Sequence, residues 1–203
     1  KLKEANHKIF SAKTVRTKRK WKERLVELRS EMAEKLSDNG FLTADAVNQM
    51  VSWDMFDQNS AASFFDADWM FGIKNGFDLV IGNPPYVLLQ NTNIPKEQIN
   101  ILNTYFYSAQ YKVDLYHLFF ELSINILTEG GILCLITPIN FTMNEHNDRL
   151  RELLLRKTKI KVLVRFYIPL FENASVDNAI TLACKNDDND SSIRVIDIKD
   201  NYK

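Results

Sequence analysis

Apolar residues recur along the chain with two different spacings, which separate predicted strands from predicted helices. Largely apolar stretches at 78–81, 132–137, 160–168 and 178–185 predict strands, and an alternating stretch at 193–198 predicts a half-exposed strand. Helical spacing predicts helices at 14–36, 43–51, 95–107, 114–127 and 145–157. The order of these elements predicts an α/β domain with a mostly parallel sheet and flanking helices, preceded by a helical segment.

The regularity of this pattern along the chain indicates how the chain divides into domains. Residues 1–13 carry weak structural signals, and we assign residues 1–52 to an amino-terminal helical segment or linker. Residues 53–203 are expected to form the main domain. Its first part, 53–76, is rich in aspartate and aromatic residues and lacks a clear period, so we expect an ordered connection whose aromatic rings pack onto the domain. The segment 128–131 is expected to be a turn.

The run at 78–81 ends in Gly82-Asn83-Pro84-Pro85-Tyr86. Its lack of polar alternation is typical of a strand buried on both faces. Neither proline has an N–H group, so the strand must end before them. Because ligands bind at the carboxyl ends of strands in open α/β sheets, this end is the first candidate for a functional site.

Charge is balanced overall but unevenly distributed. The formal net charge is zero, whereas residues 1–36 hold 12 Lys or Arg against 5 Glu. Lys18, Arg19 and Lys20 lie near the amino end of a predicted helix, where the helix dipole disfavours cations. A solvated helix face is the ordinary interpretation of such a charge run, and contact with nucleic-acid phosphates is the alternative.

Cysteine content and hydropathy indicate the cellular compartment. Cys134 and Cys184 lie in apolar runs and are expected to be buried thiols of a reduced, cytoplasmic protein. No apolar run reaches the length of a membrane span, and no secretory signal is present. The first residue is Lys1 rather than methionine, which suggests a piece of a longer polypeptide.

The residues at the end of the first strand combine two acceptors with a flat ring. The Asn83 amide oxygen and the Pro84 carbonyl oxygen can accept both hydrogens of an amine on a planar group. Pro85 restricts Pro84 to an extended conformation and stiffens the loop. Holding both hydrogens draws the nitrogen lone pair out of conjugation and makes it a better nucleophile toward a methyl group. Tyr86 can stack on the planar group, so the site acts through positioning and electrostatics.

Four stretches, in order, resemble one family. The stretch 76–86 resembles the [DNS]-P-P-[YFW] motif of N6-adenine DNA methyltransferases, in the form found in fused type IIG restriction–modification and phage-defence enzymes. The stretches 114–121, 130–138 and 170–176 resemble the following helix, the next strand and a later loop. The agreement extends from about residue 53 to residue 185. The resemblance implies a partial Rossmann-like sheet that uses S-adenosylmethionine and a bacterial or archaeal cytoplasmic location.

The resemblance also implies roles for individual residues. Asn83 and Pro84 would accept from adenine N6, with Pro85 part of the same catalytic motif. Tyr86 would stack on the flipped base and Phe171 would pack against it, since N6 cannot be reached in line inside a duplex. Asp114 and Leu115 would contact the cofactor's adenine. Double-stranded DNA is then the expected partner.

One expected part of the cofactor site is missing. None of the six glycines forms a Gly-x-Gly turn after a strand ahead of Asn83. We therefore expect the chain to be the carboxyl half of a methyltransferase domain, inactive alone and completed by the rest of its parent polypeptide. The strand at 78–81 would then be an exposed sheet edge. Such an edge is expected to be hidden by homodimerisation or by the chain's own amino-terminal segment.

Other functions are less well supported by the residues. Methylation of a protein glutamine amide uses the same motif, and a catalytically silent DNA-binding module would also explain the basic helices predicted at 13–24 and 149–165. His117 is expected to be a satisfied core histidine rather than a catalyst. Asp197-Ile198-Lys199 has the Asp-x-Lys form of a nuclease but lacks an upstream Pro-Asp partner. No zinc or calcium spacing is present.

Overall fold

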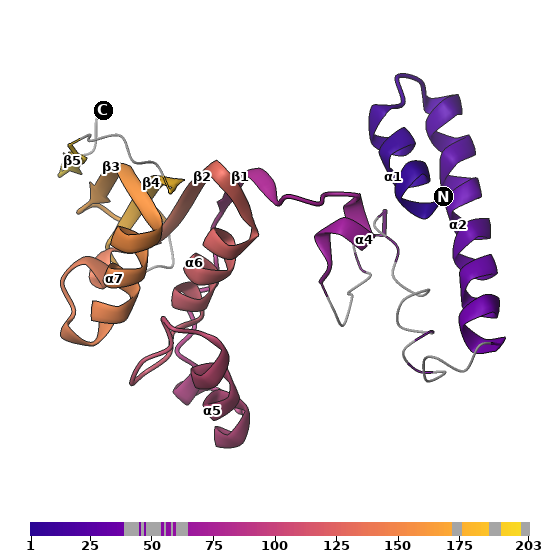
Figure 1. Cartoon of the computed structure of the whole chain (residues 1–203). Coiled ribbons are helices and arrows are strands. Elements are labelled where there is room, and N and C mark those ends of the chain that lie inside the picture. The colour runs from indigo at the N-terminus through magenta and orange to yellow at the C-terminus, as the bar shows by residue number, and fades with distance from the viewer. Residues whose placement is uncertain are drawn as a thin grey trace. The chain divides into compact units, whose positions relative to one another are not determined.

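A computed structural model describes residues 1–38, 65–171, 176–186 and 192–199, together with residues 45, 47, 54, 56, 57 and 59. The chain divides into two compact units, Lys1–Lys74 and Asn75–Lys203, each considered by itself (Figure 1). The expected domain boundary between residues 52 and 53 falls on residues that the structure does not describe. The predicted helix at 43–51 and much of the connection at 53–76 also fall mostly outside it.

The first unit is built on two helices, α1 (Leu2–Ser11) and α2 (Val15–Asp38), with a short α4 (Ala67–Phe71). Its small core contains Ala5 and Ile9 from α1 and Leu25 and Leu28 from α2. The expectation of weak structure over residues 1–13 is therefore wrong. A helix of ten residues is marginal alone, and α1 is stabilised by the apolar face that it packs against α2.

The second unit contains a five-stranded sheet in the order β1-β2-β4-β3-β5. Its strands are β1 (Phe77–Gly82), β2 (Leu127–Pro138), β3 (Thr158–Phe166), β4 (Asn178–Lys185) and β5 (Arg194–Ile198). The pairs β1–β2 and β3–β5 are parallel, whereas β4 runs antiparallel to both of its neighbours. The connection from β3 to β4 contains no described helix that could form a parallel crossover.

The predicted turn at 128–131 belongs to β2 in the structure. Pairing with β1 passes from Phe77–Leu127 directly to Leu79–Ile132, so the intervening residues of β2 form an irregularity. Gly76 lies opposite it with φ +94°, and a Cβ added there would lie 2.5 Å from the Ile126 carbonyl oxygen. Only glycine allows the chain to enter β1 this close to the backbone at Ile126, just before β2.

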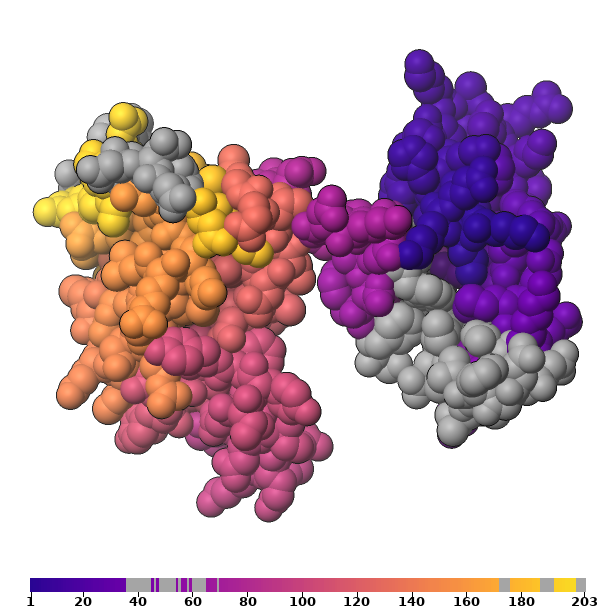
Figure 2. Space-filling view, in the orientation of Figure 1, coloured from indigo at the N-terminus to yellow at the C-terminus, as the bar shows by residue number. Residues whose placement is uncertain are grey.

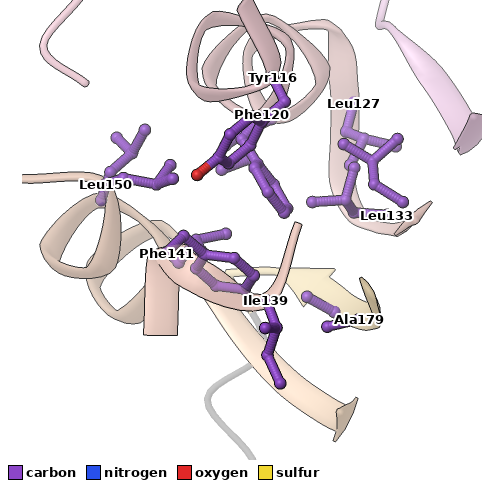
Figure 3. Packing of buried hydrophobic residues seen from close by; sticks show 13 residues of the cluster. Tyr116, Phe120, Leu127, Leu133, Ile139, Phe141, Leu150 and Ala179 are labelled. Atoms are coloured by element: carbon purple, nitrogen blue, oxygen red, sulfur yellow. The ribbon is translucent and has the colours of Figure 1, made fainter. Parts of the chain in front are cut away.

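Three helices accompany the sheet: α5 (Lys96–Tyr105), α6 (Leu115–Ile126) and α7 (Asp148–Lys157). Helices α6 and α7 both pack against one face of the sheet, and Figure 3 shows Tyr116 and Phe120 of α6 pointing toward Phe141. The Phe120 and Phe141 ring centroids are 5.3 Å apart. The buried cluster contains Tyr116, Phe120, Ile124, Leu127, Leu133, Leu135, Ile139, Phe141, Leu150, Leu153, Leu154, Ala179 and Ala183.

Side chains on the opposite face of β1 are exposed. Leu79 and Ile81 are 54% and 72% exposed, and Ile132 beside them on β2 is 43% exposed. The prediction that the 78–81 strand is buried on both faces is therefore wrong. No described element of the second unit packs over these side chains. As expected, β1 forms an edge of the sheet. Cys134 and Cys184 are free thiols, but both are partly exposed rather than buried.

Candidate active site

The end of β1 lies where the sequence predicted it. The strand ends at Gly82, and Asn83 is exposed while Pro84 is buried. Among the described residues, neither the Asn83 side chain nor the Pro84 carbonyl oxygen has a hydrogen-bond partner. Both predicted acceptors are therefore uncommitted to the protein's own donors.

Tyr86 is anchored by two strands of the sheet. Its hydroxyl donates to the Ile136 carbonyl oxygen of β2 at 3.1 Å and accepts from Asn178 Nδ2 of β4 at 3.4 Å. Its ring meets Tyr116 edge to face, with centroids 6.4 Å apart and an interplanar angle of 81°. Burial raises the pKa of Tyr86, and the hydrogen bond from Asn178 opposes the rise. The ring is thus held in one orientation beside the loop.

A cavity of about 540 Å³ lies next to Tyr86. Three segments of the second unit form most of its wall: the residues after β1, the segment leading into α6, and the residues after β2. Its lining residues are Tyr86, Leu88, Tyr111, Lys112, Asp114, Tyr116, His117, Pro138, Asn140, Asn144, Glu145, His146, Asn147 and Val176. Neither Asn83 nor Pro84 lines this cavity, whereas Tyr86 of the same loop does.

The chain between β1 and α6 is held by a small core of its own. Leu89, Ile99, Ala109, Val113 and Leu118 form a buried cluster. The buried Glu121 carboxylate accepts from the backbone N–H groups of Tyr107 at 3.0 Å and Ser108 at 2.7 Å. Figure 2 shows this segment, in pink, against the orange surface of α7. The Tyr107 hydroxyl donates a hydrogen bond to the Glu152 carboxylate of α7. These contacts fix the position of the cavity wall around residues 111 and 112.

An aromatic pair stands on this wall. The rings of Tyr111 and His146 are 4.2 Å apart with an interplanar angle of 34°. Tyr111 has φ 53°, a left-handed conformation that is uncommon outside glycine and frequent at functional sites. Arg151 holds the facing loop, since its Nη1 donates to the Phe141 and Asn144 carbonyl oxygens at 2.9 and 2.6 Å.

Sequence reasoning did not identify Tyr111 or His146 as site residues. The two are far apart in the chain, and neither belongs to a recognisable motif. A lone aromatic or histidine has no local signal that distinguishes a site residue from a surface residue. Only the folded positions of the two segments bring the rings together.

Two buried polar atoms in the cavity wall have no partner among the described residues: Asp114 Oδ1 and His117 Nε2. His117 is 4% exposed, and burial lowers its pKa to about 4. The ring thus occupies the predicted core position, while its Nε2 atom has no protein partner among the described residues. Asp114 is the N-cap residue of α6, yet its side chain makes no capping hydrogen bond. Burial raises its pKa, opposed by nearby backbone N–H groups.

Two other candidates lie away from the cavity. Leu115 packs against the cluster around Leu89. Phe171 is 39% exposed and is not among the residues that line the cavity. The structure therefore does not bring Phe171 and Tyr86 together around the cavity.

Alternative chemistries find no support in the described residues. These residues contain no cluster of His, Cys, Asp and Glu side chains that could hold a metal ion. Asp197, the acidic member of the Asp-x-Lys triplet, forms an ion pair of two hydrogen bonds with Arg165, at 2.7 and 2.8 Å.

No helix in the described ranges has both the length and the apolar character needed to cross a bilayer.

Comparison with known proteins gives consistent matches. Residues 4–171 match the sequence profile of the family described as Eco57I restriction-modification methylase. The chain is 35% identical over 127 residues to the type II restriction enzyme and methyltransferase RM.Eco57I of Escherichia coli, covering 61% of this chain and 13% of that protein. It is 32% identical over 108 residues to the type II methyltransferase M.BstVI of Geobacillus stearothermophilus, covering 52% of this chain and 18% of that protein.

Two solved structures share the fold. A putative class I S-adenosylmethionine-dependent methyltransferase from Listeria monocytogenes superposes with a TM-score of 0.50 at 14% identity, covering 63% of this chain and 38% of that one. A type I restriction–modification methyltransferase subunit from Streptococcus thermophilus gives a TM-score of 0.50 at 19% identity, covering 70% and 31%. At these identities the likeness shows a Rossmann-like methyltransferase fold, as the sequence predicted.

Proposed function

The chain belongs to the Eco57I restriction-modification methylase family, and from this premise we propose that it is the amine-positioning part of an adenine-specific DNA methyltransferase. The observation that carries the proposal is the end of β1. There Asn83 and Pro84 supply two acceptors with no partner among the described residues, beside a Tyr86 ring held by β2 and β4. This arrangement suits a planar ring bearing an NH₂ group.

The residues of the loop act on the amine before and during methyl transfer. The Asn83 amide oxygen and the Pro84 carbonyl oxygen accept the two N6 hydrogens, which localises the lone pair on nitrogen. Tyr86 fixes the plane of the base, so that the lone pair is aimed at the incoming methyl group. Asn83 and Pro84 would keep the amine in this orientation until one of its hydrogens leaves to water as a proton.

S-adenosylmethionine, when bound, supplies the electrophilic methyl group. Asp114 fits a role in holding it, because its buried Oδ1 lacks a partner and can accept a hydrogen bond. Leu115 follows Asp114 in the chain but packs against the cluster around Leu89, away from the cavity. The sequence contains no Gly-x-Gly turn for the methionine portion. We therefore propose that the remaining contacts come from other parts of a longer parent polypeptide, and that this chain alone does not turn over.

DNA is the proposed acceptor rather than a protein glutamine. Five of the eight positions from 13 to 20 are cationic and none is acidic, and all eight are exposed in the structure. Such a surface suits a phosphate backbone. We propose a bacterial or archaeal cytoplasmic enzyme of a restriction–modification or phage-defence system. Its uncovered β1 edge would be hidden by the parent polypeptide or by a second copy.

A methyl-labelling experiment tests the acceptor. The full-length parent is incubated with radiolabelled S-adenosylmethionine and either duplex DNA or a protein extract from its host. We expect the label to enter DNA, with binding that weakens steeply as salt rises, because phosphate contacts release counterions. Label in a protein glutamine would contradict the proposal. Salt-dependent DNA binding without any label in DNA or protein would instead indicate a silent DNA-binding module.

A further inference from the structure

The side chain of Asn178 is an amide buried at the end of the sheet where the loop after β1 lies. Asn178 is the first residue of β4 and is 1% exposed. Its Nδ2 atom donates to the Tyr86 hydroxyl at 3.4 Å, and its Oδ1 atom has no partner among the described residues. Burying an amide whose oxygen is left unpaired costs stability. The fold alone therefore does not explain an asparagine at this position.

Backbone bonds, rather than the amide, hold position 178 in place. Asn178 is paired with Pro138 of β2 on one side and with Phe166 of β3 on the other. Just before it, the Asp177 carbonyl oxygen accepts from the backbone N–H group of Ile139 at 2.9 Å. The amide therefore projects from a fixed point of the sheet and can serve as a support for another side chain.

The hydrogen bonds of Tyr86 show what this support holds. The Tyr86 hydroxyl donates its hydrogen to the Ile136 carbonyl oxygen at 3.1 Å. Because that hydrogen is committed, the hydroxyl oxygen can only accept from Asn178, which requires the Nδ2 group to face it. Tyr86 then offers a ligand its flat ring and no hydroxyl donor. The role of the hydroxyl is to fix the tip of the side chain to β2 and β4.

Fixing the tip of Tyr86 restricts the movement of its ring. A tyrosine side chain turns about two bonds, and an unanchored ring can swing between rotamers. Tyr116 meets the ring edge to face, with centroids 6.4 Å apart, but makes no hydrogen bond to it. A ring can position a stacked base only as well as it is itself held. Misplacement of a reacting group by about 1 Å can lower a rate by about 10²-fold.

We propose that Asn178 is a positioning residue for methyl transfer, which acts through the Tyr86 ring and does not touch the substrate. Asn178 holds the tip of Tyr86, and the ring in turn fixes the plane of the group that bears the amine. This inference rests on the proposed function, because it extends the amine-positioning site to a residue 92 positions further along the chain. The asparagine serves this position at a cost in stability.

Replacing Asn178 with leucine separates this role from a structural one. Leucine has a similar volume and no polar group, so N178L removes the unpaired oxygen together with the bond to Tyr86. We expect the urea midpoint of N178L to equal or exceed that of the unsubstituted chain. In the 203-residue chain with ¹³C-labelled tyrosine rings, N178L should shift the Tyr86 resonance in NMR spectra, and Y86F identifies that resonance.

T181V is the matched control. Thr181 is a second buried polar residue of β4, and its hydroxyl has no partner among the described residues. Valine has nearly the same shape, so T181V tests the loss of an unpaired polar atom from this strand without any change at Tyr86. It should leave the Tyr86 resonance unmoved and the methylation rate of the full-length parent unchanged.

Rates in the full-length parent test the effect on the reaction. We expect N178L to lower the single-turnover rate of methyl transfer about tenfold while DNA affinity is retained. Y86F keeps the ring and loses both anchoring bonds, so its rate should fall at least as far. The double variant N178L/Y86F should be no slower than Y86F, because both changes act through the same hydroxyl.

An unshifted Tyr86 resonance in N178L would overturn the inference, and so would an unchanged rate. Rate losses that multiply in the double variant would also overturn it, because the two residues would then act independently. A fall in stability that accompanies the slower rate of N178L would assign Asn178 a structural role instead. If the unsubstituted parent methylated no DNA, the proposed function would fail, and the Tyr86 resonance alone would decide whether Asn178 holds the ring.

Discussion

Replacing Asn83 with alanine in the full-length parent is expected to reduce methyl transfer by about 100-fold or more while DNA binding persists. The Asn83 side chain is exposed and has no partner among the described residues. Its loss therefore leaves the fold intact and removes only an acceptor for the reacting amine. Removing one preorganised hydrogen-bonding group that acts on developing charge typically lowers the catalytic rate by 10²–10³.

The control for this change is N103A on the exposed surface of α5. Single-turnover rates with radiolabelled S-adenosylmethionine, measured beside DNA affinity, separate chemistry from binding. We expect N103A to match the unsubstituted enzyme in both measurements. A rate for N83A within a few-fold of that enzyme would show that the end of β1 does not position the amine. Equal losses of rate and affinity would point to a DNA-binding role instead.

Replacing Phe120 with alanine is expected to destabilise the second unit by about 3–5 kcal/mol. Phe120 is fully buried between α6 and the sheet, and its ring contacts Phe141. Truncation would leave a cavity that the rigid sheet fills only in part. The matched control is F119A, at the preceding residue of the same helix, which is 39% exposed and should cost much less.

The choice of probe matters for this comparison. The three tryptophans, Trp21, Trp53 and Trp69, all lie in the first unit, so their fluorescence does not report directly on the second. Urea unfolding followed by circular dichroism and tyrosine fluorescence is the appropriate measurement. Similar destabilisation by F120A and F119A would contradict the packing of α6 described above.

Much of the fold was predictable because its signals are local. The end of β1 follows from two prolines that cannot donate to a ladder, and the burial of Leu150, Leu153 and Leu154 follows from their helical spacing. The position of α6 after Asp114 was also predicted. Each of these features depends on the properties of residues close together in the chain.

The incorrect predictions concern features that depend on tertiary contacts between distant parts of the chain. Helix α1 owes its stability to α2, and its own sequence shows little sign of that. The 78–81 run looks buried on both faces, yet no described element of the second unit covers Leu79 or Ile81. The anchoring of Tyr86 by Asn178 joins residues 92 positions apart. The pairing of Tyr111 with His146 likewise depends on how two loops fold against one helix.

The most direct test of the central claim is the identity of the methylated nucleoside. DNA methylated by the full-length parent is digested to nucleosides and analysed by mass spectrometry, with DNA from N83A enzyme alongside. The account predicts N6-methyladenine in the first sample and its near absence in the second. N4-methylcytosine as the product, or N6-methyladenine at equal levels in both samples, would contradict it.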